Sequence, residues 1–308
     1  IKMHRTDGLY FNYAIFTNIS PDHIGPGEHA DFEEYLYYKT RLLNMCGIGL
    51  VNKDDEHAPQ IIKAANCELY TYSEESKEAD FVASDIRYVS QPDFVGTEFH
   101  ISGKYDMEVR LGIPGLFNVV NALAAVSVCS FLGLDQARIS HALENIRVNG
   151  RMEIVYTSER CTVLVDYAHN AVSMESLLST LRDYKPKRLV CVFGCGGNRS
   201  KDRRYSMGEI GGKMADLSII TADNSRYEKV EDIIADIRGS IEKTGGKFIE
   251  IPDRREAIRY SILHAQPGDM VAVIGKGHED YQEINGVRHH FLDREVIEET
   301  VKELGEKA

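Results

Sequence analysis

The sequence predicts an α/β protein with a mostly parallel sheet in its second half. After Arg151, apolar β-prone runs alternate strictly with amphipathic segments of helix length. Four of the five strands expected there run directly into unusual polar loops. Strands that alternate with helices in this way are typical of a parallel sheet covered on both faces. The chain of 308 residues is long enough for two domains, which we place at residues 1–150 and 151–308.

The composition excludes several classes of function. A formal net charge of -12 argues against a surface that coats nucleic acid, because such a surface needs a basic face. The six cysteines show no C-x-x-C spacing, so we expect reduced thiols. No stretch approaches the roughly 20 apolar residues of a membrane span, and no signal-peptide pattern opens the sequence. We expect a cytoplasmic monomer that binds no nucleic acid and does not insert into a membrane.

The first half is predicted to contain short strands and a few helices. Asp31 is the expected cap of a helix whose apolar face includes Phe32, Tyr35 and Leu36. The last three strands lie close together and alternate apolar with polar residues, which favours an antiparallel meander. Helices are expected at residues 31–44, 118–131 and 135–146, and strands at 13–17, 49–51, 68–72, 81–89, 97–103 and 106–112.

The second half is predicted to contain the regular βα alternation. Strands are expected at residues 162–165, 188–193, 217–221, 247–251 and 270–274. Helices are expected at 172–184, 205–214, 229–243, 253–265 and 293–304.

Polar loops follow these strands. They read DYAHN (166–170), GCGGNRSKDRR (194–204), ADNSR (222–226) and GKGHED (275–280). Because parallel strands point the same way, the loops should gather along one edge of the sheet, where open α/β sheets bind ligands. The glycines and basic residues of the second loop suit an anion. Taken alone, the glycines of that loop favour an ordinary tight turn before a solvated basic helix.

These loops, in this order and spacing, resemble the C-terminal domain of the Mur ligases, and specifically the MurE branch. DRREAI (253–258) and GKGHEDYQ (275–282) are the most specific motifs. The resemblance extends upstream to HRTDGL, FTNISPDH, YYKTRLL, GLFNVVNALAA and GRME, and so covers nearly the whole chain. It implies an incomplete central ATPase domain followed by a Rossmann-like C-terminal domain.

The resemblance implies an ATP-dependent acid–amino-acid ligase of peptidoglycan precursor synthesis. Such enzymes phosphorylate the D-Glu carboxylate of UDP-MurNAc-L-Ala-D-Glu, and the amine of the incoming amino acid then attacks the acyl-phosphate. Two anions meet in the first step, so Mg²⁺ and cationic groups must offset their repulsion. His23 matches the metal-site histidine of the family, and Lys39 matches a lysine carried as a carbamate. Without the resemblance, Lys39 would be taken as a solvent-facing lysine.

The resemblance also assigns ligand residues. The positions that match the nucleotide site are Asn118, Asn121, Arg151, Asp166, His169 and Asn170. Arg5 matches an arginine that contacts the UDP-muramoyl dipeptide. The pocket for the incoming amino acid corresponds to Arg199, Asp223, Asn224, Ser225, Arg226, Gly275 and Glu279. Arginine pairs with carboxylates and Glu279 can pair with an ammonium, so the set favours meso-diaminopimelate over L-lysine.

Three departures from the family pattern affect these expectations. Ser225 replaces the proline of the DNPR-type motif, and Gly25 stands where an acidic residue is frequent. The second metal contact is therefore open to Glu28 or Asp31. The sequence contains no G-x-x-x-x-G-K-[ST] loop to cradle the phosphates. We expect the chain to be the C-terminal part of such an enzyme, inactive alone.

Two other interpretations remain open. One is a related amide ligase, such as a lysine-adding MurE or a Mur-like enzyme acting on another cell-wall precursor. The other is a catalytically silent binding fragment that keeps the sheet and the pocket. Turnover with each amino acid in turn separates the first from our choice, and a phosphate-binding loop encoded upstream of Ile1 would argue against the second.

Overall fold

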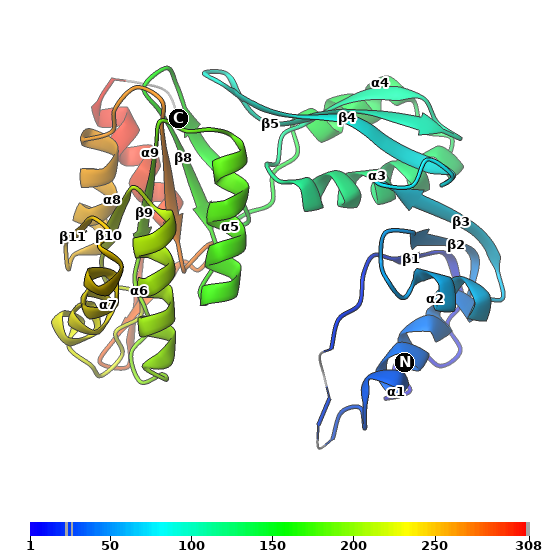
Figure 1. Cartoon of the computed structure of the whole chain (residues 1–308), viewed down its shortest axis with the longest axis horizontal. Helices are drawn as coiled ribbons and strands as arrows, with labels where there is room; N and C mark the ends of the chain where they lie inside the picture. The colour runs from blue at the N-terminus through cyan, green and yellow to red at the C-terminus, as the bar shows by residue number, and fades with distance from the viewer. Residues whose placement is uncertain (22–23, 26, 306–308) are drawn as a thin grey trace. The chain divides into compact units, whose positions relative to one another are not determined.

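The computed structural model describes residues 1–21, 24–25 and 27–305, and these residues form two compact units (Figure 1). The first unit comprises Ile1–Arg87, Thr97–Leu111 and Leu116–Asn145, and the second comprises Tyr88–Gly96, Gly112–Gly115 and Ile146–Ala308. In the part of the chain that is described, no helix is both long and apolar enough to cross a membrane. Each unit is built on its own sheet.

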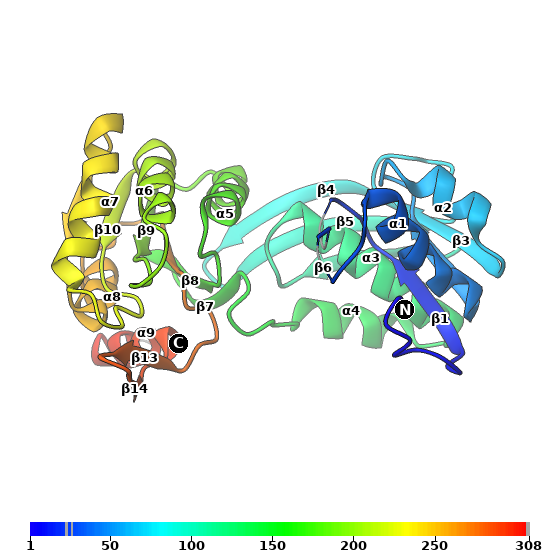
Figure 2. The same ribbon diagram turned by 90° about the horizontal axis from the view of Figure 1, so that it is seen from below.

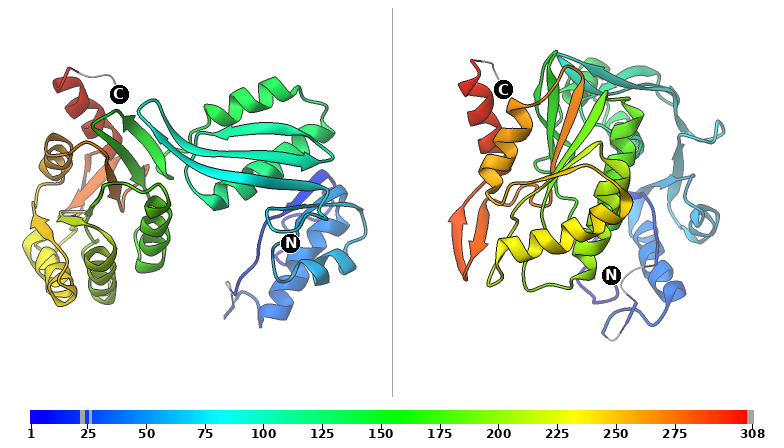
Figure 3. Two further views of the ribbon diagram at one scale, coloured as in Figure 1. Left: turned by 45° about the horizontal axis from the view of Figure 1, so that its top comes forward. Right: turned by 60° about the vertical axis from the view of Figure 1, so that its left-hand side comes forward.

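The first unit contains a six-stranded sheet in the order β1-β2-β3-β4-β5-β6. Its strands are β1 (Phe11–Phe16), β2 (Cys46–Asn52), β3 (Glu68–Ser73), β4 (Phe81–Gln91), β5 (Phe94–Gly103) and β6 (Met107–Leu111). Neighbouring strands from β1 to β4 pair parallel, whereas β5 and β6 pair antiparallel. The long neighbouring strands β4 and β5 are visible in Figure 3. The β4-β5-β6 order agrees with the predicted meander.

Two apolar cores hold the first unit together. Its helices are α1 (Phe32–Thr40), the 3-10 helix η1 (Arg41–Asn44), α2 (Ala58–Ala64), α3 (Leu116–Phe131) and α4 (Gln136–Glu144). Residues of α3 and α4 pack in one core with Leu50 and Phe99, while α1 and α2 contribute to another. Asp31 caps α1 as predicted, because its Oδ1 accepts from the Glu34 N–H at 2.8 Å. The short α2 was not predicted.

The second unit contains the predicted parallel sheet, in the order β11-β10-β9-β12-β8-β7. Its strands are β7 (Glu153–Thr157), β8 (Cys161–Asp166), β9 (Arg188–Phe193), β10 (Leu217–Ile220), β11 (Phe248–Glu250) and β12 (Asp269–Ile274). All pairs are parallel except β7 with β8. The antiparallel edge strand β7 was not predicted, but the five parallel strands lie where the sequence pattern indicates.

Helices cover both faces of this sheet (Figure 2). They are α5 (Ala171–Asp183), α6 (Asp202–Met214), α7 (Val230–Thr244), α8 (Arg254–Leu263) and α9 (Asp293–Glu303). Residues such as Leu178 and Ile237 bring α5, α6 and α7 into one core, and Ile258 and Ile297 bring α8 and α9 into the other. The chain therefore leaves β9 toward one face and β12 toward the other. Ligands of open α/β sheets bind at the carboxyl ends of such a strand pair.

A two-stranded hairpin, β13 (Tyr281–Ile284) and β14 (Val287–His290), lies between β12 and α9 and was not predicted. It is drawn in orange-red in the right-hand view of Figure 3. The hairpin contacts the loop after β10 through backbone hydrogen bonds. The Arg226 N–H donates to the Glu283 carbonyl at 2.9 Å, and the Asn285 N–H donates to the Arg226 carbonyl at 2.6 Å.

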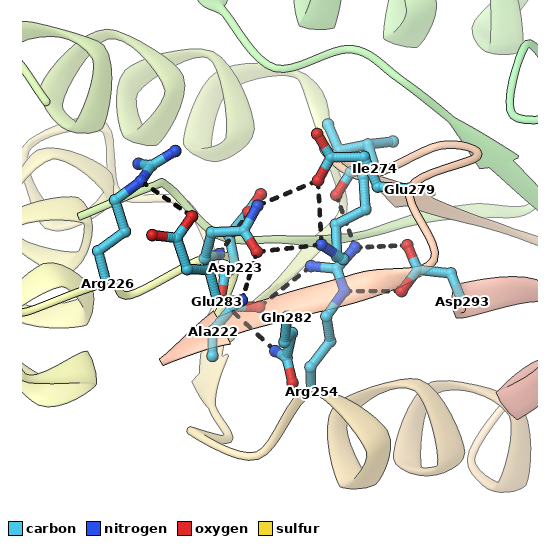
Figure 4. A network of polar contacts seen from close by, with 11 residues as sticks. Ala222, Asp223, Arg226, Arg254, Ile274, Glu279, Gln282, Glu283 and Asp293 are labelled. Atoms are coloured by element: carbon cyan, nitrogen blue, oxygen red, sulfur yellow. Dashed lines mark hydrogen bonds and ion pairs between the residues drawn. The ribbon is translucent and has the colours of Figure 1, made fainter. Parts of the chain in front are cut away.

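A buried ion pair lies beneath the carboxyl ends of β10 and β12. Arg254 and Asp293 have side chains with 0% exposure, and the guanidinium donates to both carboxylate oxygens at 2.7 Å. Arg254 also donates to the carbonyls of Ala222 at 3.2 Å and Ile274 at 2.9 Å (Figure 4). One side chain thus joins the starts of two helices to the ends of two strands.

Removal of this guanidinium should destabilise the protein strongly. We expect Arg254→Met to lower the free energy of unfolding by about 3–5 kcal/mol, because Asp293 is left buried without a counter-charge. The neighbouring Arg255 pairs with Glu299 on the surface with 47% side-chain exposure, so Arg255→Met should cost at most about 1 kcal/mol. Urea unfolding of both variants tests the difference, and equal losses would contradict the importance of the buried pair.

Candidate active site

Four loops line a pocket of about 490 Å³ at the carboxyl ends of β8, β9, β10 and β12. Six of the residues assigned above to the incoming amino acid line it, namely Arg199, Asp223, Asn224, Arg226, Gly275 and Glu279. The seventh, Ser225, is 3% exposed, and its carbonyl lies against Gly197. His169, assigned to the nucleotide, lines the same pocket. The polar loops therefore meet at one edge of the sheet, as the parallel pattern predicts.

Glycines allow the loops after β9 and β10 to pack directly on each other. A Cβ atom at Gly194 would lie 2.2 Å from the Thr221 carbonyl oxygen, and one at Gly197 would lie 1.9 Å from that of Ser225. The Gly197 N–H also donates to the Asn224 carbonyl at 2.8 Å. At these two positions the absence of a side chain allows the two loops to pack against each other.

The acidic part of the pocket is ordered by hydrogen bonds. Asn224 donates through Nδ2 to Glu279 Oε2 at 3.0 Å and accepts at Oδ1 from the Glu283 N–H at 2.9 Å. Gly275 has a φ of +110°, and a Cβ atom there would lie 2.9 Å from Asp223 Oδ2. The Glu279 carboxylate is thus held by a side chain from another loop, and the Asp223 carboxylate lies directly against Gly275.

The basic part of the pocket consists of three arginines. Arg226 adopts a φ of 52°, donates through Nη1 to the Gly197 carbonyl at 2.7 Å, and lies 3.7 Å from Glu283 Oε2 (Figure 4). Arg199 is exposed, and the half-buried Arg203 lines the same pocket. Carboxylates and guanidinium groups therefore face one cavity, which suits an amphoteric ligand.

The basic run that carries Arg199 contains residues with different roles. Arg204 is 1% exposed and donates to Glu228 and to Asp236 of α7, at 2.8 and 2.9 Å. It fastens α6 to α7 and is removed from the pocket. Arg204 is thus a structural residue of the helix start, whereas Arg199 and Arg203 of the same run face the cavity.

Residues assigned to the nucleotide lie at the carboxyl end of β8, in the loop that follows it, and in the turn before β7. The Arg151 guanidinium lies 5.1 Å from the ring centre of Tyr167. Burial raises the pKa of Asp166, and the N–H groups of Met152 and Ala168, which donate to it at 2.8 and 2.7 Å, oppose that shift. Asn170 caps α5 by accepting from Ser173 N–H at 2.9 Å.

The remaining nucleotide candidates belong to the first unit. Asn118 and Asn121 both lie on α3, where Asn118 is half-buried and Asn121 is exposed. Their helical spacing places them on one face of α3, as expected. Their assignment to a nucleotide stays a prediction.

A pocket of about 560 Å³ in the first unit contains Arg5, Glu28 and Lys39. The Lys39 ammonium lies 5.2 Å from the ring centre of Tyr35. Asp31, the other alternative for a metal contact, instead caps α1. His23 lies outside the described residues. The sequence thus brings the expected dipeptide and carbamate residues to one cavity.

A magnesium site is not formed by the side chains that the structure describes. Among residues 1–21, 24–25 and 27–305, no group of three or more His, Cys, Asp or Glu could hold a metal ion. The expected contacts through His23 and a carbamate on Lys39 therefore stay predictions.

Several pocket residues were missed at the level of sequence. They are Tyr167, Cys195, Arg203 and Tyr281 on the lining, and Lys276 beneath it. Burial raises the pKa of the Cys195 thiol to about 12, so this thiol faces the pocket in its neutral form. Most of the five lie within the polar loops that the sequence indicated. The sequence alone does not distinguish them from loop residues that face solvent, because that depends on burial and on the direction in which each side chain points.

Comparison with known proteins identifies the family. The family described as Mur ligase middle domain matches residues 1–129, and the one described as Mur ligase, glutamate ligase domain matches residues 150–277. The chain therefore belongs to the Mur ligase family, as its motifs indicate.

Similar proteins point to one branch of this family. The chain is 40% identical over 300 residues to "UDP-N-acetylmuramoyl-L-alanyl-D-glutamate--2,6-diaminopimelate ligase 2" of Clostridium acetobutylicum, covering 97% of this chain and 61% of the relative. It is 37% identical to the corresponding ligase of Caldanaerobacter subterraneus, covering 98% and 62%. A solved structure of a ligase of the same name superposes with a TM-score of 0.77 at 34% identity, covering 99% and 63%. The chain thus spans about three fifths of the length of these relatives.

The close approach of the loops gives a test of the pocket. We expect Gly197→Ala to lower the free energy of unfolding by about 1–3 kcal/mol, because the new methyl group would clash with the Ser225 carbonyl. Gly239 lies within α7, where a Cβ atom would meet nothing within 4 Å beyond its chain neighbours and the backbone of its own helix, so Gly239→Ala should raise stability by about 0.5–1 kcal/mol. Thermal unfolding measures both; a harmless Gly197→Ala would show that the loops need not touch.

Proposed function

We propose that the chain is part of an ATP-dependent amide ligase that adds meso-diaminopimelate to UDP-MurNAc-L-Ala-D-Glu through an acyl-phosphate. Membership of the Mur ligase family and the names of the relatives support this reaction class. The single observation that carries the choice of amino acid is the pocket in which Arg199, Arg226 and Glu279 face one cavity. Because the reaction uses ATP and a UDP-linked precursor, the proposed location is the cytoplasm.

The charges around the pocket match this amino acid. Arg199, Arg203 and Arg226 carry three positive charges at the rim, and Glu283 beside Arg226 offsets one of them. The net charge of two that remains on this group matches the two carboxylates of meso-diaminopimelate, and Glu279 suits its distal ammonium. The reacting amine must attack the acyl-phosphate in its neutral form. It therefore needs no carboxylate that pairs with an ammonium.

The other ligands are proposed to bind at the residues named from the motifs. Arg151, Asp166, His169 and Asn170 are proposed to contact ATP, together with the asparagines of α3. Arg5 and Lys39 line one pocket, which we propose receives the muramoyl dipeptide. When bound, Mg²⁺ would offset the negative charge of the phosphates.

Addition of L-lysine is the second candidate, and one contact favours it. Glu283 Oε2 lies 3.7 Å from Arg226 Nε, and a carboxylate at this distance weakens the attraction of Arg226 for a carboxylate of the substrate. L-lysine has no distal carboxylate and would lose nothing by this. We prefer meso-diaminopimelate because Arg199 and Arg203 add two further positive charges to the same cavity.

Turnover by the complete gene product tests the proposal. With ATP and UDP-MurNAc-L-Ala-D-Glu present, phosphate release should require meso-diaminopimelate, and L-lysine should support little. Release with L-lysine alone would establish the second candidate, and no release with any amino acid would indicate a silent binding protein.

Loss of a pocket arginine should affect one substrate. Arg226→Ala is expected to weaken binding of the diamino acid by about 2–4 kcal/mol, since a desolvated carboxylate loses its partner, and to leave the KM for ATP nearly unchanged. Arg238 pairs with Glu250 on the exposed face of α7. Arg238→Ala is therefore the matched control and should change neither constant. Equal losses for ATP and the amino acid would contradict the assignment of the pocket.

The carbamate has its own test. Lys39→Ala should abolish ligase activity, and a small added carboxylate should restore part of it, because it can replace the missing anionic group. Lys63, exposed in the last turn of α2, provides a control substitution that should leave activity intact. Full activity of Lys39→Ala would remove the carbamate from the proposal.

A further inference from the structure

Lys276 is a lysine within the motif GKGHED that no assignment above uses, and its side chain is wholly buried. It has 0% exposure and lies beneath the pocket, between the loop after β12 and the loop after β10. Burial of an ammonium is costly unless charged or polar partners surround it. The partners of Lys276 therefore show what the residue does.

Its main partner is Glu279, the acid proposed to receive the distal ammonium. Lys276 Nζ lies 3.2 Å from Glu279 Oε2 and 3.4 Å from Asn224 Oδ1. The backbone forms a turn between the two, since the Glu279 N–H donates to the Lys276 carbonyl at 2.9 Å. The ring centre of Tyr281 lies 5.3 Å from the same ammonium. The lysine and the acid are thus fixed together by a tight turn.

The two oxygens of Glu279 are treated differently. Oε2 accepts hydrogen bonds from Lys276 and from Asn224 Nδ2 at 3.0 Å. Among the residues that the structure describes, no side chain or backbone group donates to Oε1. The Glu279 side chain is 23% exposed and lines the pocket. A ligand can therefore approach the carboxylate through Oε1, while the positive charge of Lys276 keeps an ammonium away from Oε2.

The charges on the floor of the pocket and directly beneath it sum to one excess negative charge. Arg254 and Lys276 contribute two positive charges, and Asp223, Glu279 and Asp293 contribute three negative ones. Arg254 interacts electrostatically with Asp223 and Glu279 as well as with Asp293. An ammonium ligand would neutralise this floor. Without Lys276 the floor would carry two excess negative charges, and the geometry of Glu279 would depend on Asn224 alone.

We propose that Lys276 is a positioning residue that orients Glu279, so that one carboxylate oxygen receives the distal ammonium of the incoming diamino acid. The inference rests on the proposed function of this pocket. Lys276 acts through Glu279 and does not itself contact the ligand.

Kinetic constants of the complete gene product test the inference. Lys276→Met keeps the length and packing of the side chain and removes its charge. We expect the KM for meso-diaminopimelate to rise roughly 10- to 100-fold, the effect of losing a charged hydrogen-bond partner, while the KM for ATP changes less than about 2-fold. Lys213→Met, which removes an exposed lysine of α6, is the control and should change neither.

A double-mutant cycle separates positioning from simple packing. If Lys276 acts through Glu279, Lys276→Met should add less than about 2-fold to the KM of a Glu279→Gln variant. The inference would be overturned if the KM of the double variant rose by the product of the two single effects. An unchanged KM in Lys276→Met would overturn it as well.

A second cycle, measured by urea unfolding without substrate, tests the pair itself. Each single variant should be destabilised because it removes one partner of the pair, most strongly in Glu279→Gln, which leaves the buried ammonium of Lys276 without its counter-charge. The double variant should recover part of that loss. Additive losses would overturn the pairing whatever the enzyme does. A coupled pair in a protein that joins no amino acid would instead refute the proposed function, and the positioning role with it.

Discussion

The geometry of the pocket depends on the buried pair of Arg254 and Asp293. Because a buried guanidinium is tolerated only when its donors are satisfied, Arg254 fixes its partners in place. Those partners are the carboxylate at the start of α9 and the carbonyls of Ala222 and Ile274. Asp223 and Gly275, which follow these carbonyls directly, line the pocket. The positions of ligand-facing residues are therefore set by a charge pair that does not face the ligand.

Around this pair, the pocket carries charges of both signs. The floor carries one excess negative charge once Lys276 and Arg254 are counted, whereas the rim carries an excess of positive charge from its arginines. Electrostatic interactions are stronger in such a partly desolvated cavity than in water. A ligand that carries both an ammonium and carboxylates matches this set of charges. Selectivity would then follow from the combination of charges as much as from any single contact.

Sequence periodicity predicted the strands and loops that carry the site, because the formation of strands and helices depends on local sequence patterns. Apolar runs alternating with helices located the five parallel strands, and their common direction placed four polar loops at one edge. Local patterns could not indicate which loop residues turn inward. Arg203 and Arg204 are adjacent, yet one lines the pocket and the other is buried against Glu228. The hairpin of β13 and β14 was missed because its second strand is exposed throughout, so it lacks an apolar alternation.

That hairpin explains how Arg226 can hold its conformation. A φ of 52° is unfavourable for arginine by about 1–3 kcal/mol, and the two backbone hydrogen bonds to Glu283 and Asn285 offset this cost. The same strand supplies the Glu283 N–H to Asn224, which in turn orients Glu279. One short element thus connects the arginine proposed to bind a carboxylate with the acid proposed to bind an ammonium. Because both of these side chains depend on the hairpin, changes in it should alter the proposed choice of amino acid without altering Arg226 or Glu279 themselves.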